Sequence, residues 1–75
     1  MNIIIEKKIV KNIRNLREKA GLTQDYLATK LQLLGCDITR SALAKIEVGQ
    51  RHLYPDEIIL IKQILKVEYD DILKI

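Results

Sequence analysis

Apolar residues recur at helical spacing along most of the chain, and the alternating pattern of strands is nearly absent. In the first twenty residues, steps of four, four, three and four place five of them on one side of a helix: Ile5, Ile9, Ile13, Leu16 and Ala20. Gly21 follows, where helices often end in a left-handed residue. The one strand-like signal is a short β-branched run at residues 3–5. This pattern predicts a first helix that ends near Gly21.

Capping residues mark the starts of two further helices. Thr23 is a good N-cap for a second helix, which Gly35 closes. Thr39, or alternatively Asp37, caps a third helix that ends at Gly49. The apolar positions of the second helix are Leu27, Ala28, Leu31 and Leu34.

The last third of the chain predicts two more helices. Pro55 suits the first position of a fourth helix because its φ is already helical. The expected buried side of this helix consists of Ile58, Ile61, Ile64 and Leu65. A short fifth helix is expected over residues 69–73. The whole chain, residues 1–75, is therefore expected to be a single all-α domain, a compact bundle of about five short helices.

The third helix has two different sides. At 100° per residue, Leu43 and Ile46 point toward one side of the helix. The opposite side carries short side chains flanked by long cationic ones. Such a face can enter a DNA major groove, which admits one helix. The alternative is an ordinary solvated helix face, and the pattern of the third helix by itself favours this alternative. The outward face and its exposed start comprise Arg40, Ser41, Ala44 and Lys45.

Glu47 falls on the inward side of this third helix. A buried carboxylate without a partner is costly, so Glu47 needs an ion pair or hydrogen bonds. Arg17 lies on the flank of the first helix's apolar stripe. We predict that Arg17 pairs with Glu47 and ties the first helix to the third.

Helix ends and loops offer hydrogen-bond donors on both sides of the third helix. Thr23 and Gln24 open the second helix, where free backbone N–H groups can bind a phosphate. The loop after the third helix adds Gln50, Arg51 and His52. Such phosphate contacts position a reading helix on a duplex.

Composition narrows the possible functions. The 75 residues carry a net charge of +3, and residues 1–55 have ten Lys or Arg against five Asp or Glu, which suits a polyanionic partner. Cys36 and His52 are too few for a zinc site, and no phosphate-loop or oxyanion pattern accompanies them, so we expect no metal, no cofactor and no enzyme activity. No signal peptide or membrane span is apparent, and the free cysteine suits the cytoplasm.

Two sequence elements, in order and framed by matching helices, resemble one family. Gly21-Leu22-Thr23-Gln24 followed by Leu27-Ala28, and then Lys45-Ile46-Glu47-Val48-Gly49-Gln50-Arg51, are similar to the phage-repressor/Cro type of helix-turn-helix, the XRE family. The resemblance covers residues 9–73. It implies a lambda-repressor-like fold, with the helix-turn-helix at the second and third helices, in a bacterial or phage-encoded protein of the nucleoid.

The resemblance also implies roles for single residues. Positions 40, 41 and 45 face bases in the family, with Ala44 close to them, whereas Gln24 and residues 50–52 match phosphate-contacting positions. Arg17 and Glu47 match a structural ion pair. One departure is that Leu33–Asp37 adds about five residues before the third helix, so the second helix is longer or the connection looser than usual.

These observations predict a transcriptional regulator of double-stranded DNA, a repressor, that acts on no small-molecule substrate. A protein-interaction module, such as an antitoxin or an anti-repressor, is the alternative. Apolar residues cover a wide arc of the fourth helix, with Ile59 on the far side, and the C-terminus adds Ile72, Leu73 and Ile75. A homodimer that buries these residues would combine DNA binding with a protein contact. A monomer that uses them to fill its core is also compatible with the sequence.

Overall fold

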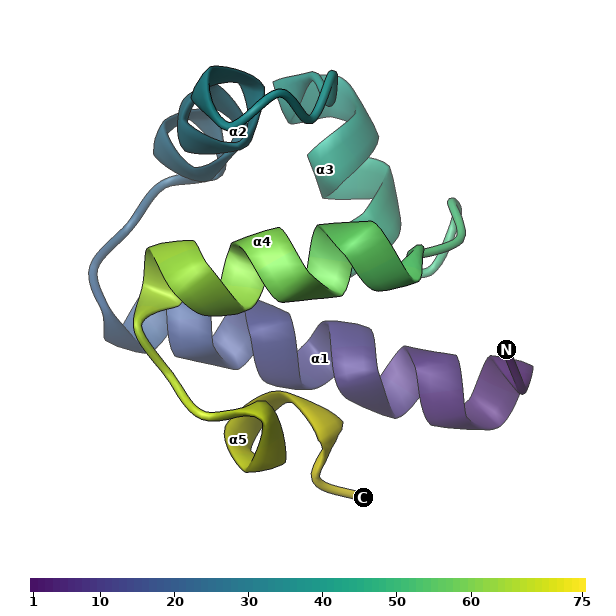
Figure 1. Cartoon of the computed structure of the whole chain (residues 1–75). Helices are drawn as coiled ribbons and strands as arrows, with labels where there is room; N and C mark the ends of the chain where they lie inside the picture. The colour runs from purple at the N-terminus through teal and green to yellow at the C-terminus, as the bar shows by residue number, and fades with distance from the viewer.

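Five helices and no strands form the chain in the computed structural model, which describes residues 1–75 (Figure 1). They are α1 (Ile3–Lys19), α2 (Gln24–Leu33), α3 (Arg40–Glu47), α4 (Pro55–Leu65) and α5 (Tyr69–Leu73). Helices α1 and α4 lie side by side, α2 and α3 cover one side of this pair, and α5 packs on α1 from the other side (Figure 1). The predicted all-helical bundle is confirmed.

The capping residues begin and end the helices where the sequence predicts. Thr23 Oγ1 accepts a hydrogen bond from the backbone N of Tyr26, and Thr39 Oγ1 accepts one from that of Ala42, both at 3.0 Å. Thr39, and not Asp37, is therefore the N-cap of α3. The three glycines that follow α1, α2 and α3 all have positive φ, and Pro55 is the first residue of α4.

The start of α1 differs from the expectation. The β-branched run at residues 3–5 is the first helical turn, because Asn2 Oδ1 accepts hydrogen bonds from the backbone N of Ile4 and Ile5. Ile5 was expected on the buried stripe, yet its exposed fraction is 37% because no other helix covers this turn. Ala20, at the other end of the stripe, is also exposed.

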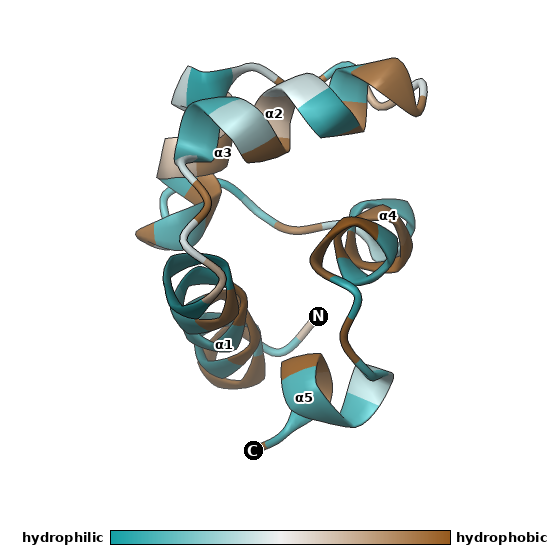
Figure 2. Cartoon of the chain, turned by 90° about the vertical axis from the view of Figure 1, so that its left-hand side faces the viewer, coloured by the Kyte–Doolittle hydropathy of each residue, from teal (hydrophilic) through white to brown (hydrophobic).

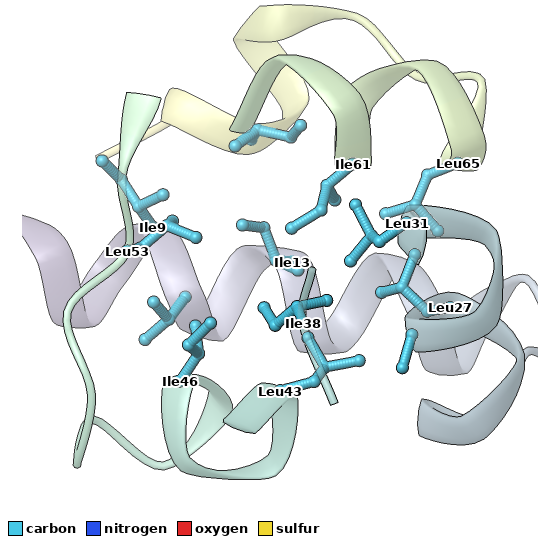
Figure 3. Packing of buried hydrophobic residues seen from close by; sticks show 13 residues of the cluster. Ile9, Ile13, Leu27, Leu31, Ile38, Leu43, Ile46, Leu53, Ile61 and Leu65 are labelled. Atoms are coloured by element: carbon cyan, nitrogen blue, oxygen red, sulfur yellow. The ribbon is translucent and has the colours of Figure 1, made fainter. Parts of the chain in front are cut away.

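The core lies where all five helices meet. In Figure 2 the hydrophobic side of α1 faces α4 and α5, and its hydrophilic side faces outward. Figure 3 shows side chains from α1, α2, α3 and α4 converging on Ile13 and Ile38. The thirteen core residues are Ile9, Val10, Ile13, Leu27, Ala28, Leu31, Ile38, Leu43, Ile46, Leu53, Ile61, Leu65 and Ile72. None of the five helices has the length and apolar character that a bilayer span requires.

Two apolar residues lie elsewhere than expected. Leu34 follows the last residue of α2 as its C-cap and is exposed, so it adds nothing to the core. Ile72 was expected to be available to a partner, but it is fully buried. Asn12 Nδ2 holds this segment by donating to the backbone O of Ile72 (2.9 Å) and of Lys74 (2.7 Å).

The connection between α2 and α3 is long but tied to the bundle. Gly35 has a φ of +86°, and this left-handed residue lets Cys36 N donate back to Leu31 O (2.9 Å). Gln32 Nε2 then donates to Ile38 O (2.7 Å), and the Ile38 side chain enters the core. The additional residues thus lengthen the turn, whereas α2 itself ends at Leu33.

Candidate nucleic-acid interface

Helix α3 presents one side to the core and the other to solvent. Leu43 and Ile46 are completely buried. The expected base-reading residues lie on or beside the outer side: Arg40, Ser41 and Lys45 are exposed and Ala44 is half-buried. The outer side of α3 is therefore free of other segments of the chain.

Two hollows flank this outer side. On the α2 side, Arg40 lines a hollow with Arg17, Thr23, Gln24 and Asp25. This hollow has only polar and charged walls, and it includes the N-terminus of α2, whose free N–H groups favour anions.

The second hollow lies between α1, α3 and the loop 48–54. Ser41 and Lys45 form its α3 wall, Lys7 contributes from α1, and Gln50 and Tyr54 contribute from the loop. Cations and hydrogen-bond donors thus border the outer side of α3 at both edges.

The ion pair predicted between Arg17 and Glu47 is present beneath the first hollow. Arg17 Nε donates to Glu47 Oε2 at 2.7 Å and Nη2 donates to Oε1 at 2.9 Å, in bidentate geometry. Arg17 Nη1 also donates to the backbone O of Leu22 (2.6 Å). The hydrogen bonds to Glu47 raise the pKa of Arg17 despite the opposing effect of burial. The pair fixes α3 on α1 with its outer side exposed.

Gln24 is a third member of this pair. Its Nε2 donates to Glu47 Oε1 (3.0 Å), so α1, α2 and α3 meet at one carboxylate. The Gln24 side chain, which was expected to bind a phosphate, therefore already donates one hydrogen bond within the protein. Its second amide hydrogen and the backbone N–H groups at the start of α2 stay available to a ligand.

Arg51 and His52 also bind carboxylates of the chain. Arg51 donates from Nη1 to Glu57 Oε1 (3.1 Å) and from Nη2 to Oε2 (3.0 Å), and these hydrogen bonds raise the pKa of Arg51. His52 Nδ1 lies 2.9 Å from Glu6 Oε1, although its side chain is largely exposed. Of the three loop residues expected to bind phosphate, only the exposed Gln50 makes no side-chain hydrogen bond within the chain.

The geometry agrees with the comparison to protein families. The helix-turn-helix family profile matches residues 13–72, which is most of the chain. The chain belongs to the XRE type of helix-turn-helix protein. Membership identifies it in general terms as a DNA-binding regulator, in a family whose members are generally not enzymes. Neither the curated proteins nor the solved structures contain a match.

Glu6 and Glu57 bind two residues of the candidate interface, Arg51 and His52, and the sequence alone did not reveal these contacts. Glu6 Oε2 accepts a hydrogen bond from Leu53 N (2.9 Å), and Glu6 Oε1 is hydrogen-bonded to His52 Nδ1 (2.9 Å). A signal for Glu6 was present, because it lies three residues before Ile9 and so on the apolar side of α1. Glu57 occupies the third position of α4, where its Oε1 accepts from Tyr54 N (2.9 Å) as in a capping box.

No three side chains of the types His, Cys, Asp or Glu come together as metal ligands in the structure. Cys36 is half-buried in the α2–α3 connection, and burial raises the pKa of its thiol. The Cys36 side chain packs against the hydrophobic core from this connection.

Proposed function

We propose that the protein is a transcriptional repressor that binds double-stranded DNA sequence-specifically and reads the major groove with α3. The observation that carries this proposal is the position of Arg40, Ser41 and Lys45 on an uncovered side of α3. The opposite side of the same helix is anchored by two fully buried residues. A rigidly held helix with an exposed cationic side suits insertion into a groove.

In this proposal the residues divide into two groups. Arg40, Ser41 and Lys45 contact base edges, with Ala44 close enough to touch a thymine methyl group. Phosphates are bound at the two edges of α3, by the start of α2 and by the loop after α3. The phosphate-contacting residues are Thr23, Gln24, Gln50, Arg51 and His52, of which Arg51 and His52 share their side chains with Glu57 and Glu6.

The regulator acts by occupying its site, without a cofactor and without chemistry. A bound domain covers the groove and the adjacent phosphates, and this excludes other proteins from the same stretch of DNA. Such an activity places the protein in the cytoplasm, at the nucleoid of a bacterial cell. Repression then depends on affinity and occupancy alone.

We further propose that two copies bind together. Ile59 of α4 and the terminal residues Leu73 and Ile75 are exposed apolar residues. A two-fold dimer reads half-sites about 34–36 Å apart, one helical turn of DNA. Ile72, being buried, is not part of this interface.

Selection of duplexes from a random pool tests the function directly. We expect enrichment of one sequence with two-fold symmetry, whereas a single asymmetric half-site would indicate a monomer. Binding to this duplex should weaken steeply with salt, because phosphate contacts release counterions. A flat salt dependence with no enriched sequence would contradict the proposal and favour the protein-interaction module.

Arg40→Ala tests the reading face. We expect a loss of about 1–3 kcal/mol on the selected duplex and a relaxed preference at one base position, since Arg discriminates bases through paired hydrogen bonds. Lys66→Ala, which removes an exposed cation that follows α4 and lines none of the hollows beside α3, is the control and should change neither. An unchanged base preference in Arg40→Ala would show that the reading face is elsewhere.

A further inference from the structure

Helix α1 carries a row of cations on its outer side, next to α3. Lys7, Lys11 and Arg14 follow one another at steps of four and three, so they lie on one side of the helix, and all three are exposed. We call these three residues the basic flank.

The basic flank adjoins the outer side of α3. Lys7 lines the same hollow as Ser41 and Lys45. All three flank residues line a third hollow together with Val48 and Gly49, at the C-terminal end of α3. The basic flank and the proposed reading face are therefore one continuous surface.

Lys7 is the link between the two parts of this surface. It lines both hollows, and its side chain lies beside Gly49, where a Cβ atom built on the glycine would meet Lys7 Cε at 3.8 Å. Its stem thus extends along the loop that follows α3, and its ammonium group has no acidic partner within salt-bridge distance.

The carboxylates near this surface are already bound elsewhere. Glu6 binds His52 and Leu53 N, and Glu47 binds Arg17. Only Arg14 has an acidic neighbour, with Glu18 Oε2 3.8 Å from its Nε, and this pair is half exposed to solvent. An exposed pair of this kind contributes little and opens easily. Lys7 and Lys11 are thus uncompensated positive charges.

We propose that the basic flank is a second phosphate-binding surface, which holds the DNA backbone beside the groove that α3 enters. This inference rests on the proposed function. Ammonium groups on long flexible stems suit phosphate oxygens at slightly varying positions, and they carry no base readout. The flank therefore adds affinity that is independent of sequence and increases the salt dependence of binding.

The test compares two double variants of the full chain on the selected duplex. Lys7→Ala with Lys11→Ala removes the two unpaired cations of the flank. Lys19→Ala with Lys66→Ala removes two exposed lysines that line none of the hollows beside α3 or the basic flank. Both doubles remove the same net charge, so they differ only in position. Binding is measured by fluorescence anisotropy over a range of salt concentrations.

We expect the flank double to reduce the log–log salt slope by about two and to weaken binding roughly tenfold to a hundredfold at about 0.1 M salt. The loss should be equal for the selected duplex and for an unrelated one. The control double should keep the wild-type slope. Lys7→Arg with Lys11→Arg, which preserves both charges, should restore binding, and circular dichroism checks that every variant is folded.

Four outcomes would overturn the inference. Equal loss in both doubles would mean that only net charge matters. An unchanged slope in the flank double, while Arg40→Ala still relaxes base preference, would remove the flank and leave the proposed function intact. Absence of any duplex binding by the wild type would overturn the flank together with the proposed function, and binding that is retained only for RNA or an acidic protein would do the same.

Discussion

Glu47 is buried, with an exposed fraction of 5%. Three donor groups from two other helices form hydrogen bonds with its carboxylate. Glu6 and Glu57 repeat this arrangement elsewhere in the domain, each with at least two donors. No buried side-chain nitrogen or oxygen lacks a hydrogen-bond partner. Each of these carboxylates joins segments that are distant in sequence or anchors a helix start, so single residues here have structural effects beyond their own helix.

Glu47→Ala should destabilise the domain strongly. The substitution leaves the largely buried guanidinium of Arg17 without its partner, and removing one member of a buried pair costs about 3–5 kcal/mol. In a domain of this size we expect the midpoint of thermal unfolding, followed by circular dichroism, to fall by more than about 10 °C.

Glu18→Ala is the matched control for this substitution. It removes the acidic member of an exposed pair on α1, whose contribution is about 0.5 kcal/mol or less. An equal fall in the two variants would mean that the burial of the Arg17–Glu47 pair has no special effect.

At the scale of elements, the α2–α3 connection determines how α3 is presented. Three local features hold it: the left-handed Gly35, the hydrogen bond from Gln32 to Ile38 O, and the buried Ile38 side chain. The sequence predicted the glycine but left open whether α2 is longer or the turn looser. Whether the helix or the turn is longer is decided only by the burial of Ile38. That burial could not be predicted from the sequence, because it depends on how α2, α3 and α4 pack around one point.

Gly35→Ala should destabilise the connection without a steric clash. No atom lies within 4 Å of a Cβ added at Gly35, so the cost comes from the φ of +86°, which an L-residue adopts at about 1–2 kcal/mol. The midpoint of urea denaturation should fall accordingly. Asn15→Ala, on the exposed side of α1, should leave the midpoint nearly unchanged, and a similar result for Gly35→Ala would show that the turn relaxes around the substitution.

At the scale of the whole molecule, charge is distributed unevenly. The basic flank, α3 and the loop after it form one cationic surface, whereas residues 56–75, in α4 and α5, carry five acidic residues against three basic ones. Such asymmetry orients a domain in the field of a polyanion before contact. In the proposed dimer, the exposed Ile59 and Ile75 contact the second copy.

Acid stability is a property of the whole domain, and Glu6 should contribute to it. The N–H of Leu53 and the His52 side chain stabilise the ionised carboxylate and lower the pKa of Glu6 below its usual value of 4.5. The unfolded chain therefore binds a proton more readily than the folded one. The stabilisation is complete above about pH 5 and is lost as the pH falls through the usual pKa toward the lowered one.

Glu6→Gln removes this contribution. The variant should be less stable than the wild type at pH 6, and the difference should shrink when the free energy of unfolding is measured near pH 3. Glu18→Gln, at an exposed site of the same helix, should show a small difference at both pH values. A difference for Glu6→Gln that does not vary with pH would contradict the assignment.

The sequence alone was sufficient for the five helices and for most of their ends, but not for the start of α1 or the extent of α2. Helical periodicity, the threonine caps and the glycine ends act within a few residues, so they can be read without knowing the fold. The outward direction of Ser41 and Lys45 followed from the same periodicity. The Arg17–Glu47 pair also followed, because a carboxylate on an inward side requires a partner.

Only the tertiary structure decided which hydrogen-bond donors are already bound to other groups of the chain. Gln24, Arg51 and His52 looked like free donors, yet packing places a carboxylate next to each of them. Packing likewise buries Ile72 and sets Lys7 beside Gly49, at the edge of the proposed reading face. These facts depend on the approach of helices that are far apart in the sequence. Local pattern determines a side chain's direction, but only the assembled helices determine what it meets there.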